Sequence, residues 1–166
     1  ELVRTRRSPD AVKAMLAEAG YGGEPILFMH PSDQTFYDAI SNVAVASFRK
    51  VGLNIDDVHM DWGTVVQRRT KKDTVDKGGW SIFPAGFPAA EYRDPAFATG
   101  IRGNGAAAWF GWPEDPVIER MRDTWMETTD EAEIKRLDRE IQARAFETLP
   151  YFPLGQYLPQ AGWRSA

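Results

Sequence analysis

Two carboxylates three residues apart, Glu91 and Asp94, have the types and spacing that most directly suggest chemistry in this sequence. Such a pair can act as general acid and general base in a hydrolase. The sequence, however, contains no Gly-x-Ser-x-Gly motif, no phosphate-binding loop and no zinc-binding His-x-x-x-His spacing. The absence of cysteine excludes thiol catalysis and thiolate metal sites. We therefore expect a protein that is not an enzyme and uses no cofactor or metal ion, with a carboxylate-based hydrolase as the weaker alternative.

Aromatic residues lie on both sides of this pair. The segment from residue 84 to residue 113 has neither a helical nor a strand period and is rich in Pro, Gly, Ala and aromatic residues. A loop of this length is usually functional or disordered, and the aromatic content argues against disorder. Six aromatic side chains in or just before it could form the walls of a binding site: Trp80, Phe83, Phe87, Tyr92, Trp109 and Trp112. The same side chains could instead form a patch that binds another protein.

The composition limits the number of domains and the kinds of partner. The chain has 166 residues, enough for one α/β domain with a real core but too few for two full domains, so residues 1–166 are predicted to form a single domain. The formal net charge of −4 argues against a nucleic-acid partner, because phosphate binding requires a clustered positive field. No apolar run approaches the roughly 20 residues that cross a bilayer.

Helix and strand signals alternate over the first half of the chain. We expect, in order, a helix capped by Ser8 and ended by Gly20, a strand Ile26–His30, a helix capped within residues 31–33 and ended by Gly52, a strand Leu53–Met60 with a bulge or bend near Asp56 and Asp57, a short helix capped by Asp61, and a strand Trp80–Phe83. This alternation predicts an α/β fold with a mostly parallel sheet flanked by helices.

Two further helices are predicted after the aromatic segment. Asp115 is placed to cap the first, and Asp130 with Glu133 has the spacing of a capping box at the start of the second. Pro150 should end the second helix. The segment Tyr151–Leu158 then reads as an extended exit, in which the prolines favour an edge or hinge strand.

Five segments in this order carry a resemblance to a known family. They are the helix from Ser8 that ends in Leu-Ala-Glu-Ala-Gly-Tyr at residues 16–21, the helix-to-strand step Phe48–Ile55, the pair Asp61-Trp62 before a short basic helix, the run Asp94-Pro95-Ala96-Phe97, and residues 130–154 with their Pro-x-x-Pro-Leu exit. The chain thereby resembles the C-terminal lobe of the family 5 extracellular solute-binding proteins of peptide and nickel ABC importers. The resemblance implies one lobe of a type II periplasmic-binding-protein fold, with the N-terminal lobe of the same protein lying outside the chain.

The resemblance also implies a function and a location. A solute-binding protein of this family would be periplasmic, or anchored to the membrane outside the cytoplasm, and would deliver a small, peptide-like solute to an ABC permease in the membrane. The loops that follow the strands, residues 30–33, 61–62 and 83–94, would face the ligand. Glu91 or Asp94 would hold the amine of a peptide, and Arg68, Arg69 or Arg93 would hold its carboxylate.

The predicted ligand-binding set is therefore Trp80, Phe83, Phe87, Glu91, Tyr92, Asp94, Trp109 and Trp112. The sequence departs from the family where a Gly-Trp-x-x-Asp motif often precedes Asp-Pro: Glu91 is nearest to the acidic position, and Trp80 lies too far upstream to be the usual tryptophan. Structural roles are the alternative at several positions. Trp62 could simply pack, Asp94 could cap a turn, and His30 could be a hydrogen-bonded structural histidine.

Overall fold

A computed structural model of the chain describes residues 7–95 and 97–158. The chain divides into two compact units, Glu1–Phe87 (unit 1) and Pro88–Ala166 (unit 2), which we describe one at a time. Within the described residues, every helix is too short or too polar to cross a bilayer.

Unit 1 is built from alternating helices and strands, as the sequence predicts. Its elements are α1 (Pro9–Glu18), β1 (Ile26–Pro31), α2 (Thr35–Lys50), β2 (Ile55–Met60), α3 (Trp62–Arg68) and a 3₁₀ turn, η1 (Val75–Lys77). The strands β1 and β2 pair in parallel over six residues, from Ile26 opposite Ile55 to Pro31 opposite Met60, and α2 is the connection between them. The α/β class and the parallel pairing are thus confirmed.

The two faces of this strand pair carry separate hydrophobic clusters. On one face, Phe28 and Ile55 pack with Ala44 and Val45 of α2. On the other, Leu27 and Met29 pack with Val65 of α3. Because successive strand residues point to opposite faces, the apolar run of β1 is buried on both sides, as in other parallel sheets.

The structure corrects three local predictions in unit 1. The bulge near Asp56 and Asp57 is absent, since the β1–β2 register is continuous. Residues 31–33 do not cap α2: its N-cap is Gln34, whose side chain makes no capping hydrogen bond. In place of a third strand, the described residues have a single parallel bridge between Phe28 and Ile82. The Ile82 N–H donates to the Leu27 carbonyl and the Met29 N–H to the Ile82 carbonyl, so residue 82 joins the sheet for only one residue pair.

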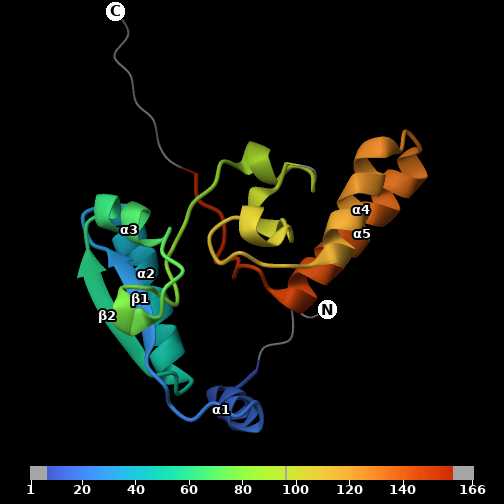
Figure 1. Ribbon diagram of the computed structural model, residues 1–166. Coiled ribbons are helices and arrows are strands. Elements are labelled where there is room, and N and C mark those ends of the chain that lie inside the picture. Colours follow the sequence, from blue (N-terminus) through green and yellow to red (C-terminus); the bar gives the residue numbers. More distant parts are fainter. Residues whose placement is uncertain (1–6, 96, 159–166) are drawn as a thin grey trace, which may run out of the picture. The chain divides into compact units, whose positions relative to one another are not determined.

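Unit 2 consists of short turns followed by a pair of helices. Its elements are η2 (Ala89–Tyr92), η3 (Thr99–Ile101), η4 (Gly105–Ala107), α4 (Pro116–Glu127) and α5 (Glu131–Thr148). The helices α4 and α5 pack side by side (Figure 1). Their core includes Ile118, Leu137 and Ile141, each at most 2% exposed.

The caps of these helices follow the sequence in part. The Asp115 carboxylate accepts the N–H groups of Val117 and Ile118, and Asp130 accepts the N–H of Ala132. The capping box at Glu133 does not form, because that carboxylate binds Arg136 at 2.6 Å. Residues 151–158 have no regular secondary structure, so the predicted edge or hinge strand is absent from the described part of the exit segment.

Candidate functional site

The loops at the carboxyl ends of β1 and β2 lie at the same edge of unit 1, because the strands are parallel. The Asp33 carboxylate, in the loop after β1, accepts the backbone N–H of Trp62 at 2.8 Å. Asp61, in the loop after β2, caps α3 by accepting the N–H of Thr64 at 2.9 Å. Two loops distant in sequence are thereby held together at the place where open α/β sheets bind ligands.

A stacked aromatic pair occupies this edge. The rings of Tyr37, from α2, and Trp62, from α3, lie 4.5 Å apart at an interplanar angle of 13°. The guanidinium carbon of Arg69 lies 5.9 Å from the Trp62 ring. Tyr37 also accepts the backbone N–H of Gly86 at 3.1 Å, which joins the third loop to the same edge. We call Tyr37, Trp62 and Arg69 the edge shelf; flat aromatic rings beside a cation suit the planar and charged groups of a peptide.

Two of the predicted residues, Trp80 and Phe83, are partly buried and pack against the core of unit 1. Their rings meet edge to face at 4.8 Å, and both pack on the cluster of Leu27, Met29 and Val65. The indole N–H of Trp80 donates to the Arg69 carbonyl at 3.1 Å, so the tryptophan supports the backbone beneath the edge shelf. Both side chains are half-buried, as is Phe87 at the end of unit 1. Their contact with a ligand stays a prediction.

The arginines predicted to hold a ligand carboxylate differ in their surroundings. Arg68 donates to the carbonyls of Gly78 and Gly79, the shortest contact being 2.7 Å, so it closes the loop after α3. Arg69 belongs to the edge shelf. In unit 2, Arg93 is exposed at the rim of a cavity. Tyr37 was absent from the sequence-based set, although its place in the first turn of the helix after a buried strand could have indicated it.

The larger cavity of unit 2 has a volume of about 330 Å³ and includes two of the predicted residues, Tyr92 and Asp94. The other lining residues are Arg93, Pro95, Ala98, Ile101, Asp138, Ile141, Gln142, Ala145, Phe146, Tyr151 and Pro153. The rings of Tyr92 and Tyr151 meet edge to face at 5.7 Å. Burial raises the pKa of the Tyr92 hydroxyl, so this group stays neutral. Asp94 accepts the N–H of Phe97 at 3.3 Å, which is the turn-capping role weighed as its alternative.

The other predicted residues of unit 2 lie in separate turns. Trp109 and Trp112 flank Phe110, with ring centroids 5.3 Å and 6.4 Å from its ring, and the Trp112 N–H donates to the Trp109 carbonyl at 2.8 Å. All three rings are half-buried. Glu91 lies in η2, one residue before Tyr92, and is also half-buried. Of the five predicted residues of unit 2, Tyr92 and Asp94 thus line the larger cavity, Trp109 and Trp112 belong to one aromatic turn, and Glu91 lies outside both groups.

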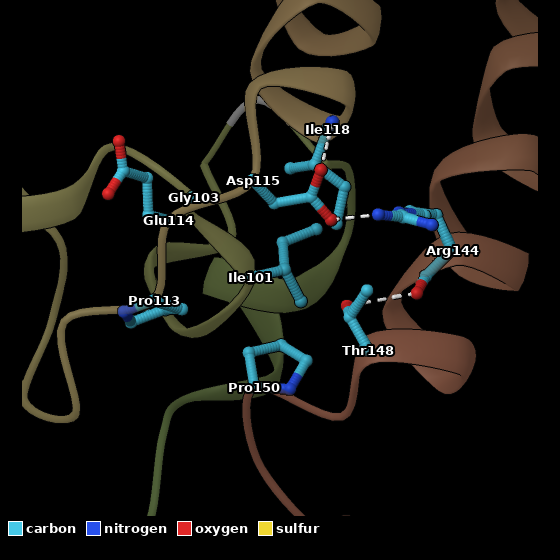
Figure 2. A pocket seen from close by; sticks show the side chains of 9 residues that line it. All are labelled: Ile101, Gly103, Pro113, Glu114, Asp115, Ile118, Arg144, Thr148 and Pro150. Atoms are coloured by element: carbon cyan, nitrogen blue, oxygen red, sulfur yellow. Dashed lines mark hydrogen bonds and ion pairs between the residues drawn. The ribbon is translucent and has the colours of Figure 1, made fainter.

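A smaller cavity of about 160 Å³ lies where α4 begins, and Figure 2 shows its lining. The buried carboxylate of Asp115 points toward Arg144 of α5, with Oδ2 2.8 Å from Nε, while its Oδ1 accepts the N–H of Ile118 at 3.2 Å (Figure 2). Both of these interactions are made with other groups of the protein, so we assign Asp115 to structure and not to ligand binding.

A second carboxylate of α4 is bound in a similar way. Glu119 pairs with Arg102 at 2.8 Å and accepts the N–H of Gly103, also at 2.8 Å. Desolvation by burial raises the pKa of Asp115 and of Glu119, but the hydrogen bonds from Arg144 and Arg102, together with backbone N–H groups, outweigh it. The net pKa of each carboxyl is therefore below its ordinary value.

These two carboxylates should make unit 2 sensitive to acid. A group whose pKa is depressed by folding stabilises the fold above its unfolded pKa, and this stability is lost as the pH falls through the folded value. We expect the urea concentration that unfolds half of unit 2 to decrease when the pH is lowered below about 4. Hydrogen exchange in α4 and α5 reports this unfolding. The double variant Asp115→Asn/Glu119→Gln should have a smaller loss of stability between pH 7 and pH 3 than the parent, and an equal loss would contradict this explanation.

The chain is similar in sequence to a known binding protein. No family model matches the chain. Over 150 residues it is 38% identical to a probable peptide ABC transporter periplasmic-binding protein of Sinorhizobium fredii, an alignment that covers 89% of this chain. The chain spans 28% of the length of that protein. This relationship extends over almost the whole chain and agrees with the resemblance to a solute-binding protein of a peptide ABC importer, whereas the assignment to the C-terminal lobe stays a prediction.

Proposed function

We propose that this chain, a homologue of part of a periplasmic-binding protein, is the C-terminal ligand-binding lobe of a protein that delivers peptide-like solutes to an ABC permease. The observation that carries the proposal is the 38% identity over 89% of the chain to a protein named for that role. A span of 28% of the relative's length suits one lobe of a two-lobed binder, with residues 1–166 contributing one side of the cleft. The protein would act in the periplasm, and its role would be binding, not catalysis.

Within this lobe, the edge shelf is the part of the described structure best suited to meet a ligand. It lies at the carboxyl ends of parallel strands and is supported by Trp80, whose indole N–H fixes the Arg69 carbonyl. The stacked rings of Tyr37 and Trp62 would cover one face of a peptide plane or an apolar side chain. The guanidinium of Arg69 would attract its carboxylate.

The remaining predicted residues enter the proposal in two groups. Gly86, which lies between Phe83 and Phe87 in the sequence, ties this loop to Tyr37, so the two phenylalanines would extend the apolar wall of the edge shelf. Glu91 or Asp94 would hold an amine, and Tyr92, Trp109 and Trp112 would supply aromatic walls. Two-lobed binders enclose their ligand by hinge closure, so the other side of the ligand would be contacted by the second lobe.

The test of this function is to ask whether the protein retains a small molecule. The whole protein that contains this chain should be purified without denaturation and examined by native mass spectrometry. We expect an added mass that is lost on denaturation and that fragments as a short peptide. If the mass corresponds to the bare protein, and stays so after incubation with a pool of short peptides, the peptide-binding proposal is wrong.

Removing the aromatic face of the edge shelf should weaken the binding of such a peptide. Trp62→Ala should raise the Kd about 10-fold or more, because a buried aromatic contact at a binding surface is commonly worth more than 1 kcal/mol. Isothermal titration calorimetry with the released peptide measures this change. Val43→Ala is the matched control, since Val43 lies on the same α2 helix as Tyr37 but is 68% exposed. An unchanged Kd for a folded Trp62→Ala protein would exclude the edge shelf from the site.

A further inference from the structure

The two histidines of the sequence are brought face to face by the register of the parallel strands. His30 of β1 is the direct cross-strand partner of His59 of β2, and both side chains lie on the face that α2 covers. Their rings stack with centroids 3.9 Å apart and an interplanar angle of 24°. The pair therefore follows from the fold: a shift of one residue in register would separate the two rings.

His30 is completely buried, and carboxylates approach both of its ring nitrogens. Nδ1 lies 2.8 Å from Asp57 Oδ1, and Nε2 lies 3.0 Å from Asp38 Oδ1. Asp57 is two residues before His59 on the same face of β2, and its side chain is 14% exposed. Asp38 comes from the first turn of α2 and is more open, at 41%. The sheet thus supplies two imidazoles and one carboxylate, and the helix supplies a second carboxylate.

This arrangement has the features of a metal site with an orienting carboxylate. A histidine that binds a metal through one nitrogen usually donates its other N–H to a carboxylate, which fixes the ring and its tautomer. Asp57 is placed to do this for Nδ1 of His30 through Oδ1, leaving Nε2 of His30 directed toward Asp38. The other oxygen of Asp57, Oδ2, lies 3.4 Å from Nε2 of His59. His30, Asp38 and His59 each offer one ligand atom, and these three atoms all lie within 4.8 Å of one another.

We propose that His30, Asp38 and His59 bind a divalent transition-metal ion of the borderline class, such as Zn²⁺, and that Asp57 positions His30. Two imidazole nitrogens and one carboxylate oxygen suit such ions, whereas Ca²⁺ and Mg²⁺ prefer sites made of oxygen ligands alone. The partial exposure of Asp38 and His59 leaves room for water to complete the coordination. The proposal departs from our sequence-based expectation that the chain binds no metal, and it does not depend on the proposed transport function.

The proposal is tested by titrating the metal-free, untagged protein with Zn²⁺ in competition with a chromophoric chelator. We expect saturation at one equivalent and no comparable binding of Mg²⁺. His59→Asn, which changes a half-exposed side chain, should weaken Zn²⁺ binding at least 10-fold. Asp57→Asn should weaken it by about 10- to 100-fold, the usual effect of losing an orienting carboxylate.

A matched pair of variants separates this site from general attraction of cations to an acidic protein. Asp38→Asn and Asp56→Asn each remove one negative charge, but Asp56 is exposed and points to the opposite face of β2. We expect weaker Zn²⁺ binding only for Asp38→Asn. Imidazole ¹⁵N resonances provide a second measurement, and Zn²⁺ should shift those of both His30 and His59.

Equal Zn²⁺ affinity in the parent, His59→Asn and Asp38→Asn proteins would overturn the proposal, as would unshifted imidazole resonances. His30 would then be a buried histidine held by two carboxylates, a structural role that needs no metal. The Trp62→Ala protein should bind Zn²⁺ as the parent does, whether or not its peptide binding is weakened. Failure of the metal site and failure of the transport proposal can therefore be told apart.

Discussion

Replacing Gly103 by alanine should destabilise unit 2 by about 2–4 kcal/mol, because the new methyl group would meet backbone atoms. A Cβ at this position would lie 2.7 Å from Asp115 N and 2.8 Å from Asp115 O. These atoms cannot withdraw easily. The Asp115 N–H donates to the Gly103 carbonyl at 2.8 Å, and the Gly103 N–H donates to Glu119 at the same distance. Any shift that relieves the clash would break the contacts at the start of α4.

Urea denaturation followed by hydrogen exchange in α4 measures this effect. Gly22→Ala is the matched control, since the nearest atom to a Cβ at Gly22 is the end of the flexible, exposed Glu24 side chain. This control should change the free energy of unfolding by less than about 0.5 kcal/mol. Similar stabilities for the Gly103→Ala protein and the parent would mean that the segments around Gly103 and Asp115 are not held together as described.

The second large effect is expected in unit 1, where Met29→Ala should cost about 2–5 kcal/mol. Met29, a residue of β1, is 0% exposed, and its side chain packs with Leu27 and with Val65 of α3. Truncation would leave a cavity beneath Trp80, which packs on the same cluster and supports the edge shelf. We expect earlier urea unfolding of unit 1 and, in the whole protein, weaker ligand binding.

Met126→Ala provides the comparison, because this methionine is 58% exposed and its loss removes little packing. Hydrogen exchange in β1 and α3 distinguishes the two variants: only Met29→Ala should accelerate it. A loss below about 1 kcal/mol for Met29→Ala would indicate that the cluster collapses around the smaller side chain.

Features encoded by neighbouring residues could be predicted from the sequence. Ser8, Asp61, Asp115 and Asp130 each accept a backbone N–H two or three residues ahead, so their helix starts needed no knowledge of the rest of the fold. The prediction for residues 31–33 was wrong for the opposite reason. The Asp33 carboxylate binds the N–H of Trp62, a partner that is distant in sequence.

The bulge predicted near Asp56 and Asp57 concealed a second feature. The polar pair interrupts the apolar alternation of β2, and a sequence alone cannot say whether the backbone or the side-chain environment changes there. In the structure the strand is unbroken, and the Asp57 carboxylate lies 2.8 Å from Nδ1 of His30, which explains a polar residue at this position. His30 was weighed as a hydrogen-bonded structural histidine, but its stacking on His59 depends on a register that no local signal specifies.

The candidate site was predictable in its location more than in its residues. The edge of the sheet follows from the order of strands and helices. Trp62 was weighed there as a packing residue or a ligand contact, and its side chain does pack on the cluster of Leu27, Met29 and Val65. Tyr37 was missed because its stacking partner comes from another helix. The ligand-binding roles of the eight residues chosen from the sequence stay predictions.

The parallel pairing of β1 and β2 has a consequence for the order of folding. Their hydrogen bonds can form only after the chain that contains α2 has closed into a long loop, which slows folding through its entropic cost. In unit 2, α4 and α5 are separated by a short connection and are neighbours in sequence. Helical pairs of such low contact order assemble faster than parallel strands. The half of the chain that leaves the ribosome last should therefore be the first to acquire its native helix packing.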